Sequence, residues 1–197
     1  GNVAAMVEVN SETDFVAKNE EFQEMVKNIA KQVIVTNPAD VDTLLASKFV
    51  GDESVTIKDI ITEKIAKIGE NMNVRRFARL EGNVVDYIHM GGKIGVMVKF
   101  DTDVDASKPE FKEFAKDIAM QVAALNPKFI TEADVPAEFI AKETEILTAQ
   151  AKNDPKNASK PENIIAKMIE GRVSKALQEV CLVDQIYFRD GSSKVSA

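Results

Sequence analysis

Two stretches of the chain share one spacing of apolar residues and resemble each other in sequence. Glu21–Pro38 aligns with Glu110–Pro127 at an offset of 89, and ten of the 18 positions are identical. In both stretches the apolar residues fall at i, i+3, i+4, i+7, i+8 and i+11, which is the buried stripe of an amphipathic helix. Both stretches end in Asn-Pro, where a helix is expected to stop because the residue before a proline disfavours the helical conformation. The pattern predicts two equivalent helices.

A β-patterned run precedes each of these helices. Val3–Val9 resembles Ile94–Phe100, but at an offset of 91. The connection from strand to helix is therefore two residues longer in the first copy. We expect a duplicated unit of strand, loop and helix.

Further elements are predicted between the two copies. Residues 55–68 have the apolar spacing of another helix. Three β-rich runs follow and predict a hairpin and a meander, with turns at Gly82-Asn83 and Gly91-Gly92. These runs cover residues 74–82, 84–90 and 93–100.

The pattern changes in the C-terminal part of the chain. Residues 137–152 and 161–177 carry apolar residues at near-heptad spacing. This spacing predicts an antiparallel helical hairpin that partly projects. The apolar run at residues 181–188 predicts a final strand or strand pair.

These elements together predict an α+β fold of duplicated subdomains, with small antiparallel sheets packed against helices and a projecting antiparallel helical hairpin. We expect one core subdomain over residues 1–91 and a second over residues 92–135 and 176–197. Residues 136–175 then form the hairpin, inserted in the second subdomain. Because the chain begins with Gly1 rather than Met, we expect a fragment or a processed form.

Composition narrows the classes of function. A single cysteine (Cys181) and a single histidine (His89) exclude an internal disulfide framework, multi-cysteine metal sites and histidine-rich zinc cages. The net charge of −7 argues against electrostatically driven binding to nucleic acid or to an anionic membrane. We therefore expect no enzymatic activity, no cofactor and no metal. One cysteine suits a reducing compartment, so a cytoplasmic location is expected, with an organellar matrix or stroma left open.

Several candidate sites have simpler interpretations. Residues 101–105 (DTDVD) imitate the start of a calcium loop, but Ala106 and Lys112 stand where that loop needs Gly and Glu, so an acidic loop is expected. Residues 91–95 are expected to form a tight turn rather than a phosphate loop. Arg75-Arg76 is expected on a solvated strand face, and Cys181 is expected to be a buried small hydrophobe.

The extended first loop, Asn10–Asn19, leaves two interpretations open. Phe15 lies seven residues before Phe22, so it can simply top the buried stripe of the following helix. Alternatively, Asp14 and Phe15 form an exposed knob, because a rigid aromatic at a loop tip makes a good binding hot spot.

The segment around this loop, residues 7–22, reads VEVNSETDFVAKNEEF. Five further segments follow it along the chain: KIGENMNVRR, YIHMGGKIGVMV, DIAMQVAALNP, KPENIIAKMIEGR and EVCLVDQIYF. In these six segments, which agree in collinear order, the sequence resembles a known family, bacterial-type elongation factor Ts, which comprises guanine-nucleotide exchange factors for elongation factor Tu. The resemblance implies a core region without the small N-terminal helical domain of the family.

The resemblance also implies a mechanism. The loop Thr13–Val16 is expected to insert beside the magnesium and phosphate site of GDP-bound elongation factor Tu, with Phe15 as a wedge and Asp14 bonding to nearby groups. Residues 89–95 are expected to dock on another domain of that partner, in its GDP-bound and nucleotide-free forms. The implied partner-binding residues are Thr13, Asp14, Phe15, Val16, His89, Met90, Gly91, Gly92, Lys93, Ile94 and Gly95. The alternative is a structural module that self-associates through its core and has no exchange activity of its own in this truncated form.

Overall fold

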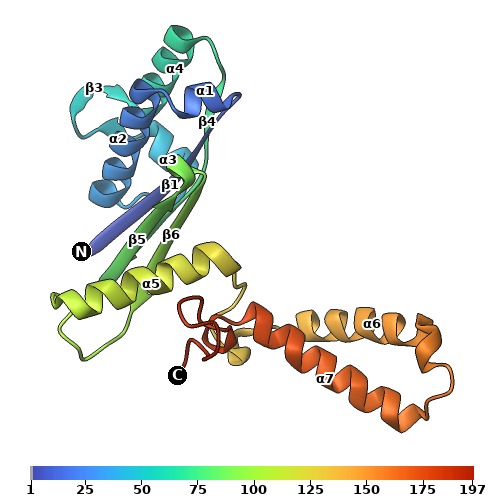
Figure 1. The fold of residues 1–197 in the computed structure, drawn as a ribbon. Helices are drawn as coiled ribbons and strands as arrows, with labels where there is room; N and C mark the ends of the chain where they lie inside the picture. The colour runs from blue at the N-terminus through green and yellow to red at the C-terminus, as the bar shows by residue number, and fades with distance from the viewer. Residues whose placement is uncertain (1) are drawn as a thin grey trace. The chain divides into compact units, whose positions relative to one another are not determined.

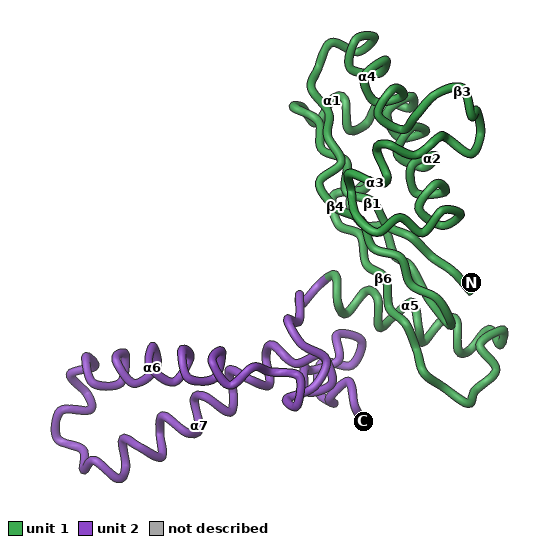
Figure 2. The backbone as a smooth tube through the Cα atoms, turned by 180° about the vertical axis from the view of Figure 1, so that it is seen from behind, with its two compact units in different colours: residues 1–123 green, residues 124–197 purple. Residues whose placement is uncertain are grey.

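The chain folds into two compact units, residues 1–123 and residues 124–197 (Figure 2). The computed structural model describes residues 2–197. Two-stranded antiparallel sheets combine with helices, so the predicted α+β class is confirmed (Figure 1). The subdomain boundaries expected from the sequence, including the insertion of residues 136–175, stay a prediction.

The first sheet pairs strand β1 (Val3–Ser11) antiparallel with strand β4 (Met72–Glu81). The register shifts between Glu8 and Val9, so Arg75 is an extra residue on β4 at this point. Met72 and Val74 are buried on the side that packs against the hydrophobic core. One face of the sheet is therefore turned toward the core, while Met6 on the other face of β1 lies close to Gly95 of the later strand at residues 94–100.

Helix α2 (Glu20–Thr36) packs on this sheet and confirms the first predicted helix. It begins after Asn19, whose side chain accepts a hydrogen bond from the backbone N–H of Phe22. It ends at Asn37, which takes a left-handed conformation (φ 44°) just before Pro38. Its predicted apolar stripe is buried, together with residues of α3 (Val41–Ala46) and α4 (Ile57–Ile68); these core residues include Phe22, Met25, Ile29, Val33, Leu44, Ile57 and Ile61.

A buried glutamine joins α2 to a small hairpin formed by β2 (Lys48–Phe49) and β3 (Asp52–Thr56). The Gln32 side chain is fully buried. Its Nε2 donates to the backbone oxygen of Lys48 (2.7 Å) and to Ser47 Oγ (3.0 Å), and its Oε1 accepts from Val50 N (2.9 Å). The equivalent residue of the second copy, Gln121, is also fully buried.

Strands β5 (Asn83–His89) and β6 (Ile94–Phe100) form a hairpin around the 3₁₀ turn η1 (Met90–Gly92), as predicted. The predicted meander is wrong where it joins this hairpin to the preceding strand. Among residues 2–197, β4 pairs with β1 instead of β5, and Gly82 (φ 112°) ends β4 by donating its N–H to Asn2. The local pattern could not show this pairing because β1 lies far away in the sequence.

Helix α5 (Pro109–Leu125) follows β6 and confirms the second predicted helix of the repeat. The ring of Phe100, at the end of β6, packs edge-on against Phe111 of α5, with ring centroids 5.4 Å apart. The apolar stripe of α5 buries Ala115, Ile118 and Ala119. Strand, connection and helix thus occur in both copies, as the repeat predicted.

The second unit contains the predicted antiparallel helical hairpin, α6 (Ala137–Asn153) and α7 (Glu162–Val180) (Figure 1). Among the described residues, α7 has no buried side chain and α6 has only Ala151. The 3₁₀ turn η2 (Glu132–Asp134) precedes α6, and the 3₁₀ turn η3 (Pro155–Asn157) lies in the loop between α6 and α7. Asn157 of η3 donates to the backbone oxygen of Ala151 (2.9 Å), which fixes the loop between the two helices.

The strand predicted at residues 181–188 is wrong. The segment forms the 3₁₀ turn η4 (Leu182–Asp184) and contributes only isolated bridges, between Phe129 and Cys181 and between Ile186 and Lys194. A short apolar run does not distinguish a strand from a buried turn, and here Leu182 and Cys181 are buried in a turn. The predicted burial of Cys181 is confirmed, and this burial raises the pKa of its thiol.

None of the helices in residues 2–197 combines the length and apolar character needed to cross a bilayer.

Candidate functional site

The extended first loop contains a short helix of its own, α1 (Asp14–Ala17). Thr13 caps this helix, because its hydroxyl accepts a hydrogen bond from the backbone N–H of Val16 (3.4 Å). Val16 is buried in the core cluster, whereas the Phe15 side chain is 87% exposed. Of the two interpretations that the sequence left open, the exposed knob is therefore confirmed.

Phe15 points outward because α1 and α2 are separate helices. The chain leaves the helical path at Asn19, which has an extended backbone (φ −68°, ψ 132°) and starts α2. The seven-residue spacing from Phe15 to Phe22 therefore does not place both rings on one face. Val16 occupies the buried position on α1 in place of Phe15.

The loop is tied to the segment that follows α4. Thr13 donates two hydrogen bonds to Glu70, from its backbone N to Oε1 (3.0 Å) and from its hydroxyl to Oε2 (2.7 Å). In return, the backbone N of Asn71 donates to Glu12 Oε1 (3.3 Å). Sequence reasoning gave no role to Glu70, and a contact across 57 positions leaves no local signal in a single sequence.

The turn between β5 and β6 presents a second exposed surface. Met90 (φ 53°), Gly91 (φ 66°) and Gly92 (φ 102°) take successive left-handed conformations, which the two glycines adopt without steric cost. The Met90 side chain is 62% exposed, and that of Ile88 is 54% exposed. The tight turn predicted for this segment is confirmed, and it carries apolar side chains into solvent.

An ion pair brings the two predicted site segments together. Lys93 Nζ lies 3.3 Å from Asp14 Oδ2, although the two residues are 79 positions apart. Close packing of the strands supports this approach, since a Cβ added to Gly95 would lie 2.4 Å from Met6 Sδ on β1. The exposed Phe15 and Met90 thus belong to neighbouring segments of the same unit.

His89 and Ile94, two further residues of the predicted docking segment, lie on either side of the turn. His89 is exposed at the end of β5, and its Nδ1 lies 2.7 Å from the hydroxyl of Tyr87. Ile94 is half-buried at the start of β6, where it pairs with His89 across the hairpin. The structure therefore places residues 89–95 in one hairpin end beside the loop that carries Phe15.

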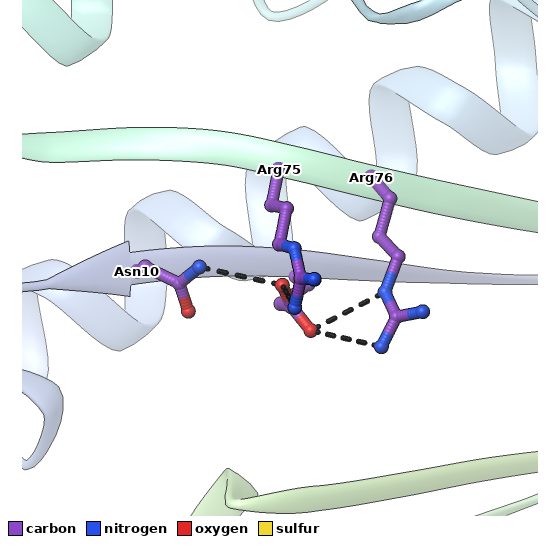
Figure 3. Close-up of polar contacts among 4 residues, drawn as sticks. Asn10, Arg75 and Arg76 are labelled. Carbon is purple, nitrogen blue, oxygen red and sulfur yellow. Dashed lines mark hydrogen bonds and ion pairs between the residues drawn. The ribbon is translucent and has the colours of Figure 1, made fainter.

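Two of the arginines of β4 lie close to a single carboxylate of β1. Arg75, Arg76 and Asn10 all converge on the carboxylate of Glu8, at distances of 3.2–3.3 Å (Figure 3). Both arginine side chains are exposed, so the predicted solvated strand face is confirmed. Partial burial raises the pKa of Glu8, but the hydrogen bonds from Asn10 and Arg76 and the charges of both arginines outweigh it, and the net pKa is lowered.

This lowered pKa predicts an acid-sensitive contribution to stability. The pKa of Glu8 in the folded state lies below its ordinary value of 4.5, so the folded chain binds this proton less readily than the unfolded chain. The stabilisation by the Glu8 carboxylate is therefore fully present above pH 4.5 and is lost as the pH falls through the folded-state pKa. We expect Glu8→Gln to reduce the free energy of unfolding at pH 7 by about 0.5–1 kcal/mol and to have a smaller effect at pH 3.

Urea unfolding at pH 3, 4.5 and 7 measures this effect. Glu53→Gln is the matched control, since Glu53 is an exposed carboxylate on β3 in another sheet. An effect of Glu8→Gln that stays constant from pH 7 to pH 3 contradicts a stabilising role for the Glu8 carboxylate.

Among residues 2–197, no group of three or more His, Cys, Asp or Glu side chains lies close enough to hold a metal ion. The loop at residues 101–105 is instead closed by local hydrogen bonds, in which Asp105 accepts from the hydroxyl (2.7 Å) and the backbone N (2.9 Å) of Ser107. These two bonds lower the pKa of Asp105. Phe15 has the highest exposure of the large hydrophobic residues described in the first unit, and the exposed Met90 lies on the neighbouring hairpin end; such side chains are suited to contact another protein.

Comparison with known proteins gives this surface a context. Residues 12–197 match the family model described as Elongation factor TS. The elongation factor Ts of Clostridioides difficile (strain 630) is 47% identical over 190 residues, which cover 95% of this chain and 60% of that protein. The corresponding protein of Clostridium perfringens (strain SM101) is 49% identical over 195 residues, covering 98% and 62%. That of Trichlorobacter lovleyi is 44% identical over 200 residues, covering 99% and 63%.

These matches first define the class, which is that of the elongation factors of protein synthesis. Within this class, the chain belongs to the elongation factor Ts family, because the family model covers residues 12–197. The chain spans 60–63% of the length of the relatives named above.

Proposed function

We propose that this chain promotes the release of GDP from elongation factor Tu by inserting Phe15 beside the nucleotide site of that partner. The observation that carries the proposal is the 87% exposure of Phe15 on a helix that is capped by Thr13 and anchored by Val16. An aromatic ring left in water costs free energy, and a ring presented on an ordered backbone loses little entropy when it binds.

The wedge acts on the partner and leaves the nucleotide untouched. Elongation factor Tu holds GDP through a phosphate loop and a magnesium ion that neutralises the phosphate charge. Phe15 enters between helices of the nucleotide-binding domain and displaces the groups that coordinate magnesium and phosphate. Asp14, whose side chain is 69% exposed, exchanges its contact with Lys93 for groups of the partner.

The hairpin end at residues 89–95 provides a second contact. Its exposed Met90 and Ile88 dock on another domain of elongation factor Tu, while the glycines of the turn allow close approach of the backbone. Because both contacts lie on one compact unit, they oppose the return of the displaced helices to their original positions. By linkage, GDP weakens the binding of this chain by the same factor by which the chain weakens the binding of GDP.

The direct test is the release of fluorescently labelled GDP from elongation factor Tu with and without this chain, at a range of chain concentrations. We expect an acceleration of GDP release that saturates with the concentration of the chain. Light scattering on the chain alone and with elongation factor Tu measures the molar mass, and so tests the alternative that the chain is a self-associating structural module. Self-association of the chain together with unaltered GDP release would favour the structural module and overturn the exchange function.

We also propose a cytoplasmic location, which the single free cysteine and the role in translation support.

A further inference from the structure

The pairing of β1 with β4 ends at Ser11 and Met72, and side chains continue the connection beyond that point. On one side, the Glu70 carboxylate accepts the backbone N–H and the hydroxyl of Thr13. On the other side, Glu12 accepts the backbone N–H of Asn71. Each segment thus supplies one carboxylate that accepts a backbone N–H of the other.

Glu70 is itself held in place from both directions. Helix α4 ends at Gly69, which takes a left-handed conformation (φ 84°) and donates its N–H to Ile65 O (2.8 Å). Two residues after Glu70, Met72 is buried in the core at the start of β4. The carboxylate therefore projects from a short connection between two ordered elements.

Thr13 transmits this contact to α1. Its hydroxyl donates to Glu70 and accepts from the N–H of Val16, so one side chain joins the carboxylate to the first turn of the helix. A helix of four residues has no stability of its own and depends on contacts at its ends. Val16 anchors α1 in the hydrophobic core. Glu70 holds Thr13, the residue at which α1 begins.

We propose that Glu70 is a positioning residue that preorganises the Phe15 knob for binding, a role that rests on the proposed function and deepens it. Because the ring of Phe15 is exposed, its direction depends on the backbone of α1. A backbone that is already in the binding conformation loses less conformational entropy in the complex. Glu70 acts through Thr13 and α1, and it thereby fixes the direction of the Phe15 side chain.

The experiment compares Glu70→Ala with the parent chain in the release of labelled GDP from elongation factor Tu. We expect the chain concentration that gives half-maximal acceleration to rise about tenfold, the loss typical of a hydrogen-bonded carboxylate, with little change in the maximal rate because Phe15 is still present. Thr13→Val removes the hydroxyl bond but keeps the backbone N–H bond to Glu70, so it should raise the half-maximal concentration by less than Glu70→Ala does.

Glu21→Ala is the matched control. Glu21 is a half-exposed carboxylate that contacts Lys64 (3.3 Å) and Lys67 (2.8 Å) and joins α2 to α4 without touching the loop. This variant should leave the half-maximal concentration unchanged. A loss equal to that of Glu70→Ala would mean that any weakening of this unit lowers binding, and it would overturn the positioning role.

A double variant tests whether Glu70 acts through Phe15. In a chain that already carries Phe15→Ala, Glu70→Ala should cause no further loss, because there is no ring left to position. Additive losses in the double variant would show that Glu70 acts independently and would overturn the proposal.

Amide hydrogen exchange in the free chain provides a readout that does not depend on the partner. We expect Glu70→Ala to speed exchange at Val16, Ala17 and Lys18, whose N–H groups bond within α1, while exchange in α2 stays unchanged. If Phe15→Ala proves silent in GDP release, the proposed function fails and this measurement alone decides the positioning role. Unchanged exchange at those three amides would overturn it.

Discussion

Replacing Phe15 with alanine is expected to cost about 2–4 kcal/mol of the coupling between this chain and GDP release, the range of aromatic hot spots. In rate terms, GDP release at a subsaturating concentration of the chain should slow by about 30-fold to 1,000-fold relative to the parent. The free energy of unfolding should change by less than about 0.5 kcal/mol, because substitutions at exposed positions have small effects.

The separation of these two effects follows from the position of the ring. With 87% of its side chain exposed, Phe15 contributes little packing to the isolated chain. Were the ring part of the core, truncation to alanine would cost about 3–5 kcal/mol of stability. Val16, the next residue, is buried, so Val16→Ala should lower the free energy of unfolding by about 1–3 kcal/mol, unlike Phe15→Ala.

Stopped-flow release of labelled GDP measures the first quantity, and urea unfolding measures the second. Phe114→Ala is the matched control, since Phe114 is a phenylalanine on α5 with 49% of its side chain exposed. This control should leave GDP release unchanged. If Phe15→Ala releases GDP as fast as the parent chain, the wedge mechanism is wrong.

The second large effect is expected at Gln32. Replacing this residue with leucine should lower the free energy of unfolding by about 2–4 kcal/mol, because three buried hydrogen bonds are lost while their partners stay in place. The side chain is fully buried and bonds to Ser47, Lys48 and Val50. Leucine fills a similar volume, so the loss reports the hydrogen bonds more than a cavity.

The hairpin of β2 and β3 is the part of the fold that depends on Gln32. The backbone N of Val50 and the backbone oxygen of Lys48 both bond to its amide, so the glutamine side chain holds this segment against α2. Hydrogen exchange in the hairpin should therefore increase more than exchange in the β1–β4 sheet.

Urea unfolding of Gln32→Leu and Ser47→Ala provides the graded comparison. Ser47→Ala removes only one of the acceptors of the Gln32 amide and should cost about 1 kcal/mol. A Gln32→Leu chain as stable as the parent would show that the hydrogen bonds only compensate for the burial of the amide.

Particular residues show how far sequence reasoning reaches in this chain. The helices at residues 20–36 and 109–125 were predictable within one or two residues, because their apolar stripes and Asn-Pro ends are local signals. The run at residues 181–188 was not, since the same apolar composition suits a strand and a buried turn. The site segments were recognisable through the family resemblance, but their joining through Asp14 and Lys93 was not.

The sequence by itself determined the duplicated unit of strand and helix, the hairpin around Gly91-Gly92 and the family of the protein. These features are encoded in periodicity, turn residues and short sequence segments, each made of residues that lie close together in the chain. Only the tertiary structure decided that β4 pairs with β1, that Phe15 faces solvent while Val16 is buried, and that Glu70 holds Thr13. Each of these depends on contacts between residues distant in sequence, whose free energy exists only once the chain has folded.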